Sequence, residues 1–372
     1  MNWLTRCAAL VVLASLGACA SGPDKPNPTP LQALTPAISV SPAWQAQMGA
    51  PTSGLRMGVG NHAVALASTS GLVQVRQAQS GQLDWSASLG HGIVAGVGFD
   101  GTHVAVVDDQ NQLTAVAQGK VLWRSPLGAR TYTPPLVAGG RVFVLNAERE
   151  VLAFDARTGA KLWSLPYVGE PLVLRSPGLL AAYDNNLLVG LGERLVAIHP
   201  DNGQAFWSVA LTQPRGVNEI ERLMDVVAGA HAANGLICAR AFQSNVACVS
   251  APNSVRVWSQ DSDGVAGVTG DDVHLISTDR SGRVQAWAMK DGTPLWTQDA
   301  LRFRGAGTPV VLGLSLAVGD AQGYVHWLSK EDGRMLNRMP TDGSAIAAPP
   351  VLVDSTLIAL TTQGGVFAWQ PR

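Results

Sequence analysis

Charged side chains are scarce in this chain of 372 residues: they make up 14% of it, and the formal net charge is −1 at pH 7. Proteins that bind nucleic acid concentrate lysine and arginine on one face, and proteins that bind basic partners often carry an acidic tail. The sequence has neither feature. We therefore expect no nucleic acid or other polyanion as a partner.

Motifs of common catalytic and metal sites are also missing. The seven histidines are scattered without metal-ligand spacing, and neither His-Glu-x-x-His nor Gly-x-Ser-x-Gly occurs. Residues 96–101 match the dinucleotide fingerprint, but no helix is predicted after them to receive a pyrophosphate. Three acidic pairs fall in predicted turns, where carboxylates normally face solvent: Asp108 with Asp109, Asp261 with Asp263, and Asp271 with Asp272. We expect no metal, no cofactor and no catalysis.

The apolar run at residues 8–16 is too short to span a bilayer. Arg6 precedes it and small residues follow, which is typical of a signal peptide, expected over residues 1–18. The string Leu16-Gly-Ala-Cys19 resembles the bacterial lipobox, in which cleavage precedes a cysteine that becomes acylated; an ordinary secretory signal is the alternative. Two or more acyl chains anchor stably. No aspartate follows Cys19, which resembles lipoproteins sent to the outer membrane.

Residues 20–42 contain six prolines and few large apolar residues. This composition predicts an extended tether, which we place at residues 19–41 together with the lipidated cysteine. The remaining chain, residues 42–372, is expected to form one domain.

A motif recurs through that domain about every forty residues: a short apolar strand, a turn closing on glycine, and a tryptophan. The marks are Trp44, Trp85, Trp123, Trp163, Trp207, Trp258 and Trp296, with Asn337 in the eighth place. A fixed period of about this length signals a propeller, a solenoid or an array. We expect the tryptophans to pack between neighbouring repeats, each gaining about 4–6 kcal/mol before ordering costs. Asn337 then marks the weakest contact.

Turn signals come in threes between successive marks, so each period holds four strands. Dipeptides such as Asp100-Gly101 and Asn234-Gly235 tolerate the positive φ of tight hairpins, and helical periodicity is nearly absent. We therefore expect an all-β fold, an eight-bladed β-propeller of four-stranded antiparallel blades. The last period has only three candidate strands. Residues 42–48 are expected to complete the C-terminal blade and close the ring.

Cys238 and Cys248 flank a predicted hairpin turn. A two-residue turn at Gln243-Ser244 would place the two sulfurs on opposite faces of the sheet, and a three-residue loop would pair them. We favour the two-residue turn, which leaves two free buried thiols. The disulfide is the alternative.

The spacing departs from the period most between Trp207 and Trp258, and next between Trp163 and Trp207. The extra residues join consecutive pairs of blades, and connectors between blades all cross the same end of a propeller. We therefore predict that both connectors meet in one protein-binding surface. Its predicted members are Leu172, Leu174, Arg175, Ile220, Leu223 and Asp225. The alternative is that these leucines merely plug the propeller end.

Two families resemble this sequence. The Ala-x-Asp-x-x-Thr-Gly-x-x-x-Trp repeat resembles that of quinoprotein dehydrogenases, eight-bladed propellers that bind pyrroloquinoline quinone on the axis. Those enzymes are longer and add a tryptophan floor, a calcium site and an adjacent-cysteine disulfide, none of which is evident here. A dehydrogenase-like propeller is thus the second functional hypothesis, and an envelope module that binds peptides or glycans is the third.

The more specific resemblance is to the BamB family of outer-membrane assembly lipoproteins. It is carried by residues 171–176, 218–226, 295–298 and 319–334. It implies a non-enzymatic scaffold on the periplasmic face of the outer membrane, monomeric within a complex, that docks on POTRA domains of the barrel subunit BamA; contact with nascent outer-membrane proteins is left open. Leu172, Leu174 and Arg175 match the family's Leu-x-Leu-Arg segment. Asp225 matches the first of two interface aspartates, and the second falls on Val227.

Overall fold

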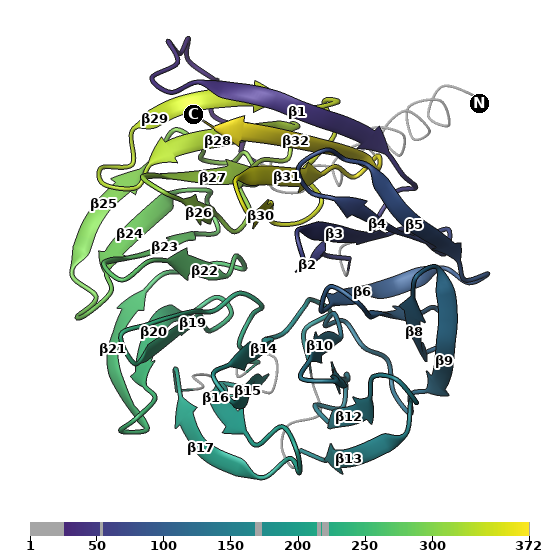
Figure 1. The fold of residues 1–372 in the computed structure, drawn as a ribbon. Coiled ribbons are helices and arrows are strands. Elements are labelled where there is room, and N and C mark those ends of the chain that lie inside the picture. Colours follow the sequence, from purple (N-terminus) through teal and green to yellow (C-terminus); the bar gives the residue numbers. More distant parts are fainter. Residues whose placement is uncertain (1–25, 53–54, 168–172, 214–216, 218–222, 372) are drawn as a thin grey trace, which may run out of the picture.

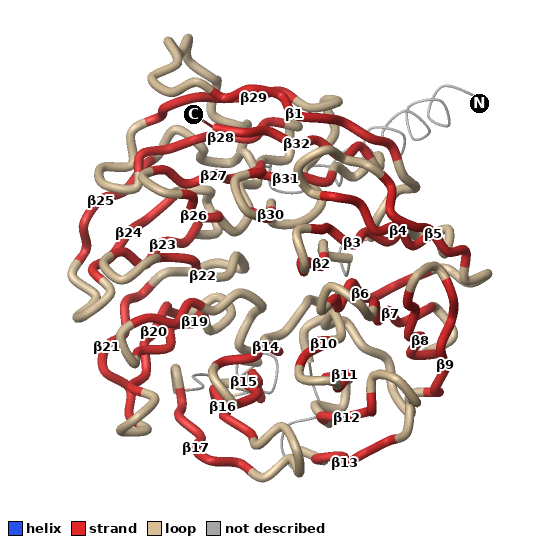
Figure 2. The backbone as a smooth tube through the Cα atoms, viewed as in Figure 1, coloured by secondary structure: helices blue, strands red, loops and turns tan. Residues whose placement is uncertain are grey.

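The computed structural model describes residues 26–52, 55–167, 173–213, 217 and 223–371. Within these residues the fold is all-β, with thirty-two strands in eight antiparallel sheets of four. The sheets follow one another around a common centre (Figure 1) and are joined by turns and loops (Figure 2). The predicted eight-bladed β-propeller is confirmed. No helix among the described residues is long and apolar enough to cross a membrane.

Each blade is numbered here in chain order, with its strands running from the centre of the ring outward. Blades 1 to 4 comprise β2 (Gly58–Gly60), β3 (Ala63–Ala67), β4 (Leu72–Gln77), β5 (Leu83–Ser88); β6 (Ile93–Phe99), β7 (Val104–Asp108), β8 (Gln112–Ala117), β9 (Lys120–Pro126); β10 (Leu136–Ala138), β11 (Arg141–Leu145), β12 (Val151–Asp155), β13 (Lys161–Leu165); and β14 (Leu180–Tyr183), β15 (Asn186–Leu191), β16 (Arg194–Ile198), β17 (Ala205–Ala210).

Blades 5 to 8 have the same order of strands. They comprise β18 (His231–Ala233), β19 (Leu236–Arg240), β20 (Asn245–Ser250), β21 (Val255–Asp261); β22 (Val268–Gly270), β23 (His274–Thr278), β24 (Val284–Ala288), β25 (Pro294–Gln298); β26 (Val310–Leu312), β27 (Ser315–Gly319), β28 (Tyr324–Ser329), β29 (Met335–Pro340); and β30 (Val351–Val353), β31 (Thr356–Leu360), β32 (Gly365–Pro371), β1 (Val40–Gln47).

The ring is closed by β1, which pairs antiparallel with β32 as the outermost strand of blade 8 (Figure 1). Val40 faces Pro371 at one end of the pair, and Gln47 faces Gly365 at the other. The predicted closure by the N-terminal strand is therefore confirmed, with the strand beginning two residues earlier than expected.

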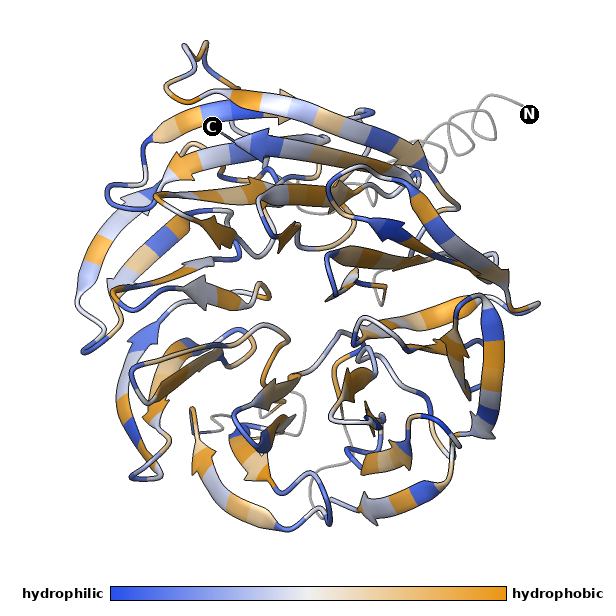
Figure 3. Ribbon diagram, in the orientation of Figure 1, coloured by the Kyte–Doolittle hydropathy of each residue, from blue (hydrophilic) through white to orange (hydrophobic). Residues whose placement is uncertain are grey.

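Burial explains why these short segments are strands. Every residue of β3, β7 and β23 is buried, since each of these strands has a neighbouring blade on both faces. The outer strand β5 instead alternates exposed and partly buried residues, with one face on the next blade and one in water. Figure 3 shows the same contrast, with hydrophobic residues concentrated in the inner strands.

The repeated tryptophans lie between neighbouring blades, as predicted. Five of them donate their indole N–H to a backbone carbonyl of the next blade: Trp44 to Ala78, Trp123 to Ala156, Trp163 to Pro200, Trp258 to Met289 and Trp296 to Lys330. Each ring also covers a turn glycine. At Gly159, with φ +73°, an added Cβ would lie 2.6 Å from the Trp123 ring, so both the backbone conformation and the close approach require glycine.

Asn337 stands at the junction of blades 7 and 8, close to the segment that leads into the closing strand β1. Its side-chain amide is buried and donates to the carbonyl of Ile38, 2.8 Å away. The amide therefore makes the same kind of contact as the indole N–H groups, with a smaller side chain.

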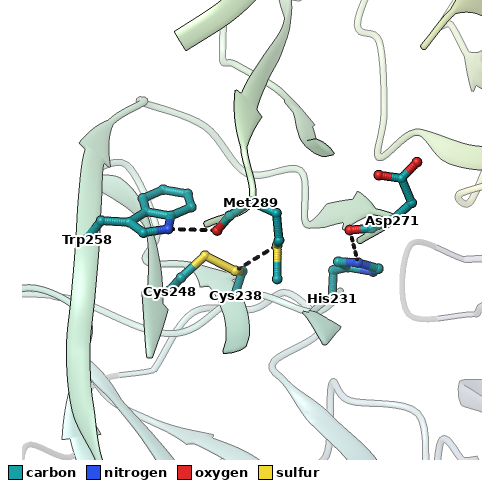
Figure 4. The surroundings of a disulfide bond; sticks show 6 residues. All are labelled: His231, Cys238, Cys248, Trp258, Asp271 and Met289. Carbon is teal, nitrogen blue, oxygen red and sulfur yellow. Dashed lines mark hydrogen bonds between the residues drawn. A yellow bond between two sulfur atoms is a disulfide. The ribbon is translucent and has the colours of Figure 1, made fainter. Parts of the chain in front are cut away.

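The two cysteines correct a prediction. Cys238 and Cys248 lie directly opposite each other in β19 and β20, and they form a disulfide, so the expectation of free thiols is wrong (Figure 4). The reason is the length of the turn. Ala241 donates its N–H to Asn245, and Gln243 takes a positive φ of 48°, which makes a three-residue loop. The disulfide is buried beside Met289 and Trp258.

Part of the predicted tether lies on the propeller. Residues 26–39 contain no helix or strand. Even so, Thr29 donates its N–H to the carbonyl of Arg302, and Ala37 donates its N–H to the carbonyl of Leu336. The guanidinium of Arg304 donates to the carbonyl of Thr29 at 3.1 Å. The N-terminal segment is thus bound to blade 7 and the connector before it. Cys19 lies outside the described residues.

Arg304 is itself held by a buried charged cluster. Its Nε lies 2.7 Å from Oδ2 of Asp320, which also accepts a hydrogen bond from His326 at 2.9 Å. Burial alone would raise the pKa of Asp320, but hydrogen bonds from His326, the Tyr324 backbone and Arg304 outweigh it and lower that pKa. Burial also lowers the pKa of His326. The cluster therefore fixes the site on which the N-terminal segment lies.

Candidate functional site

The two long connectors meet at one end of the ring. This end, called the connector end below, carries the links between blades and the turns between the second and third strands of each blade. Leu179 donates its N–H to Val226, and Ala228 donates its N–H to Pro177. Gly178 and Val227 form an antiparallel bridge between these contacts. The predicted proximity of the connector between blades 3 and 4 and the connector between blades 4 and 5 is confirmed.

The carboxylate of Asp225 joins the connectors to blade 3. Its Oδ2 accepts the backbone N–H of Leu174 at 3.0 Å, and its Oδ1 pairs with the guanidinium of Arg149 at 2.8 Å. The Arg149 and Asp225 side chains are only 7% and 16% exposed. A charge pair that is this well shielded depends on both partners, because either charge left alone would be costly to bury. Asp225 therefore positions the Leu174 segment.

Arg149 comes from the turn between β11 and β12. Its backbone is in the left-handed region, with φ +59°, and its guanidinium lies over the ring of Tyr167, 5.6 Å from the ring centre. The sequence predicted only a turn at this position. The contact with Asp225 joins residues 76 apart in the chain and follows from the ring topology, so no local pattern could have revealed it.

The connectors pack closely onto the blades beneath them. A cavity of about 40 Å³ lies between Thr133, Leu145, Leu174, Pro177 and Asp225. This volume holds little more than a water molecule or two. These contacts therefore hold the described parts of the connectors against the blades.

Arg175 faces outward from this arrangement. It is exposed, and with Arg130, Tyr132, Asp109 and Pro177 it lines an open hollow of about 390 Å³. Leu174 and Leu223 are partly buried. Leu172 and Ile220, which complete the predicted surface, lie outside the described residues.

Val227 occupies the place of the second interface aspartate in the resemblance described above. It is 3% exposed, and its N–H donates to the carbonyl of Arg240. Its side chain belongs to the interior of the connector end, so this position offers no polar group to the surface.

The acidic pairs in turns have structural partners. Asp108 is buried, which differs from the solvent-facing carboxylate that we expected, and its Oδ1 accepts the backbone N–H groups of Gln110 and Gln112 at 2.9 Å. Asp271 pairs with Lys330 of the next blade. Over the described ranges, no group of three or more histidine, cysteine, aspartate or glutamate side chains is arranged to hold a metal ion.

Comparisons with known proteins agree with the specific resemblance. A family model described as outer membrane protein assembly factor BamB matches residues 69–298. The factor of that name from Burkholderia pseudomallei is 37% identical over 100% of both chains. The crystal structure of BamB from Moraxella catarrhalis superposes with a TM-score of 0.81, at 23% identity over 89% of this chain and 100% of that one.

Quinohaemoprotein alcohol dehydrogenase from Comamonas testosteroni is also similar in structure. Its TM-score is 0.66 at 14% identity, over 89% of this chain and 76% of that chain. A likeness at this identity shows a shared fold alone. By its full-length relative and its matching family model, the chain belongs to the BamB family of outer membrane protein assembly factors.

Proposed function

We propose that the protein is a non-catalytic scaffold in outer-membrane protein assembly, and that it binds POTRA domains of a BamA-like barrel subunit through its connector surface. This surface consists of Leu172, Leu174, Arg175, Ile220, Leu223 and Asp225. One observation carries the proposal: the Asp225 carboxylate holds Leu174 against the second connector, next to the exposed Arg175. An apolar centre with a charge at its rim suits a protein partner.

The pre-formed shape of this surface favours docking. The backbone bonds between the connectors and the Arg149–Asp225 pair fix its described part before any partner arrives. A surface that needs little ordering loses less entropy on binding than a mobile loop does. The exposed Arg175 supplies a planar guanidinium, which is well suited to pair with a carboxylate of the partner.

The proposal includes a lipid anchor at Cys19 that holds the propeller at the periplasmic face of the outer membrane. It rests on the Leu16-Gly-Ala-Cys19 string and on the absence of aspartate at position 20. Mass spectrometry of the mature protein should find an acylated N-terminal Cys19. An unmodified N-terminus at any other residue would contradict the anchor.

Co-purification tests the docking surface. We expect Arg175→Glu to weaken recovery of the barrel subunit with the full-length protein by roughly tenfold or more, since hot-spot charges at interfaces are worth about 2 kcal/mol. Arg157→Glu is the matched control, because Arg157 is also exposed and lies in the turn between β12 and β13, at the opposite end of blade 3. Full recovery with Arg175→Glu, or equal loss with Arg157→Glu, would overturn the assignment.

A further inference from the structure

A second feature of the connector end lies near the centre of the ring, away from the connector surface. Arg56 belongs to the link between blade 8 and blade 1, just before β2. Its N–H donates to the carbonyl of Gly96 at 2.6 Å, and its own carbonyl accepts the N–H of Val97 at 2.9 Å. These two bonds, with the parallel bridge between Leu55 and Gly96, hold the Arg56 backbone in one place.

The guanidinium of Arg56 has no hydrogen bond or ion pair within the part of the chain that the structure describes. Three other arginines at the same end are paired: Arg149 with Asp225, Arg283 with Asp279, and Arg304 with Asp320. Burial lowers the pKa of Arg56 to about 10, so the group remains a cation at neutral pH. Arg56 is partly exposed, so an anion from solvent can reach the guanidinium and form a charge-assisted pair with it.

Arg56 lines a cavity of about 300 Å³ that is large enough for a small ligand. The opposite walls come from the links between blades 6 and 7 and between blades 7 and 8. Their small or apolar members are Ala306, Gly307, Ile346, Ala347, Ala348 and Pro349. The walls can therefore receive a short apolar group while the guanidinium receives a charge.

The other charged residues that line the cavity do not neutralise Arg56, so Arg56 remains able to bind an anion. The Asp279 carboxylate already accepts hydrogen bonds from Arg283 and Ser281, at 2.7 and 2.8 Å. Arg280 also lines the cavity and adds a second positive charge. The summed charge of Arg56, Asp279 and Arg280 is positive, which favours an anionic ligand over a cationic one.

We propose that this cavity binds a carboxylate carried on a small apolar group, as at the C-terminal residue of an extended peptide, with Arg56 as the group that grips the carboxylate. The planar guanidinium presents two parallel N–H donors, which match the two oxygens of a carboxylate. The small side chains opposite then contact the apolar part of the ligand. This site is separate from the connector surface, which belongs to blades 3, 4 and 5.

The full-length protein can be titrated with acetyl-Ala-Ala and with its C-terminal amide, followed by saturation-transfer NMR. We expect the acid to bind and the amide to bind at least about tenfold more weakly, because a hydrogen-bonded charge pair is lost. Acetate should bind more weakly than the dipeptide acid, since it lacks the apolar body. The proposal would be overturned if the acid and the amide bound equally well, or if acetate bound as well as the dipeptide acid. It would also be overturned if inorganic phosphate displaced the dipeptide acid at the same concentration as acetate does.

Variants identify the residue responsible. Arg56→Gln should weaken binding of the acid about tenfold or more, and Arg56→Lys should fall between it and the native protein because it keeps the charge but not the fork. Arg130→Gln is the control, since Arg130 is exposed at the same end but lines a different hollow. Unchanged binding in Arg56→Gln, or an equal loss in Arg130→Gln, would overturn the proposal. If Arg56→Gln fails to fold, the acid–amide comparison on the native protein still decides the result.

Discussion

Removing the carboxylate of Asp225 is expected to destabilise the protein by about 3–5 kcal/mol, the usual result of breaking a buried ion pair by removing one partner. Asp225→Ala removes the ion pair with Arg149, whose side chain is 7% exposed, and removes the carboxylate that accepts the N–H of Leu174. A domain of roughly 330 residues unfolds with an entropy of about 0.7 kcal/mol/K, so the melting temperature should fall by about 4–7 °C. Calorimetry measures both quantities.

A double-mutant cycle separates the ion pair from other effects. Arg149→Met together with Asp225→Ala should be less destabilised than the sum of the two single variants by about 1–3 kcal/mol, because the energy of the pair is lost only once. The exposed pair of Arg141 and Asp201 is the control: its side chains are 28% and 57% exposed. Each single replacement there should cost less than about 1 kcal/mol. Additive effects of the Arg149 and Asp225 variants would refute the reasoning.

Two further predictions concern the contacts between blades. Gly159→Ala should destabilise the protein by about 2–4 kcal/mol, because the new Cβ meets the Trp123 ring at 2.6 Å, whereas Gly140→Ala, with φ +74° and no atom within 4 Å, should cost only about 1 kcal/mol; equal melting temperatures would contradict this. Burial on its own would raise the pKa of Asp271, but hydrogen bonds from Lys330 and backbone N–H groups lower it well below its usual range. A depressed carboxyl pKa stabilises the fold above the unfolded value of about 4, and this stability is lost as the pH falls below it. The urea midpoint of Asp271→Asn should therefore fall less between about pH 6 and about pH 3 than that of the native protein, and parallel pH profiles would count against the Asp271–Lys330 contact.

The fold was predictable because its signals are local and repeated. Five of the tryptophans lie four residues after a turn glycine, and the missing fourth strand of the last repeat identified the strand that closes the ring. The turn between β19 and β20 was different. The loop has three residues because Ala241 forms a backbone hydrogen bond with Asn245 and Gln243 takes a positive φ. A positive φ at a residue other than glycine could not be predicted from the sequence.

The candidate site was predictable only in outline. Consecutive connectors had to be neighbours in a ring, so the contact of Leu174 with Asp225 followed from topology. The part played by Arg149 did not, because it depends on how the turn of one blade reaches the connector of another. Val227 likewise looked like a surface position by its match to an aspartate, and only packing shows that it is interior.

The pairing of β1 with β32 unites the first and the last strands of the described propeller. Seven sheets can assemble in order as the chain lengthens, but the eighth must wait until β32 has been synthesised. Until then the strand at residues 40–47 has open hydrogen-bonding groups, and a chain truncated after β31 would lose β32 and with it the strand that pairs with β1. Closure of the ring therefore depends on residues 365–371, so a propeller that lacks them remains open.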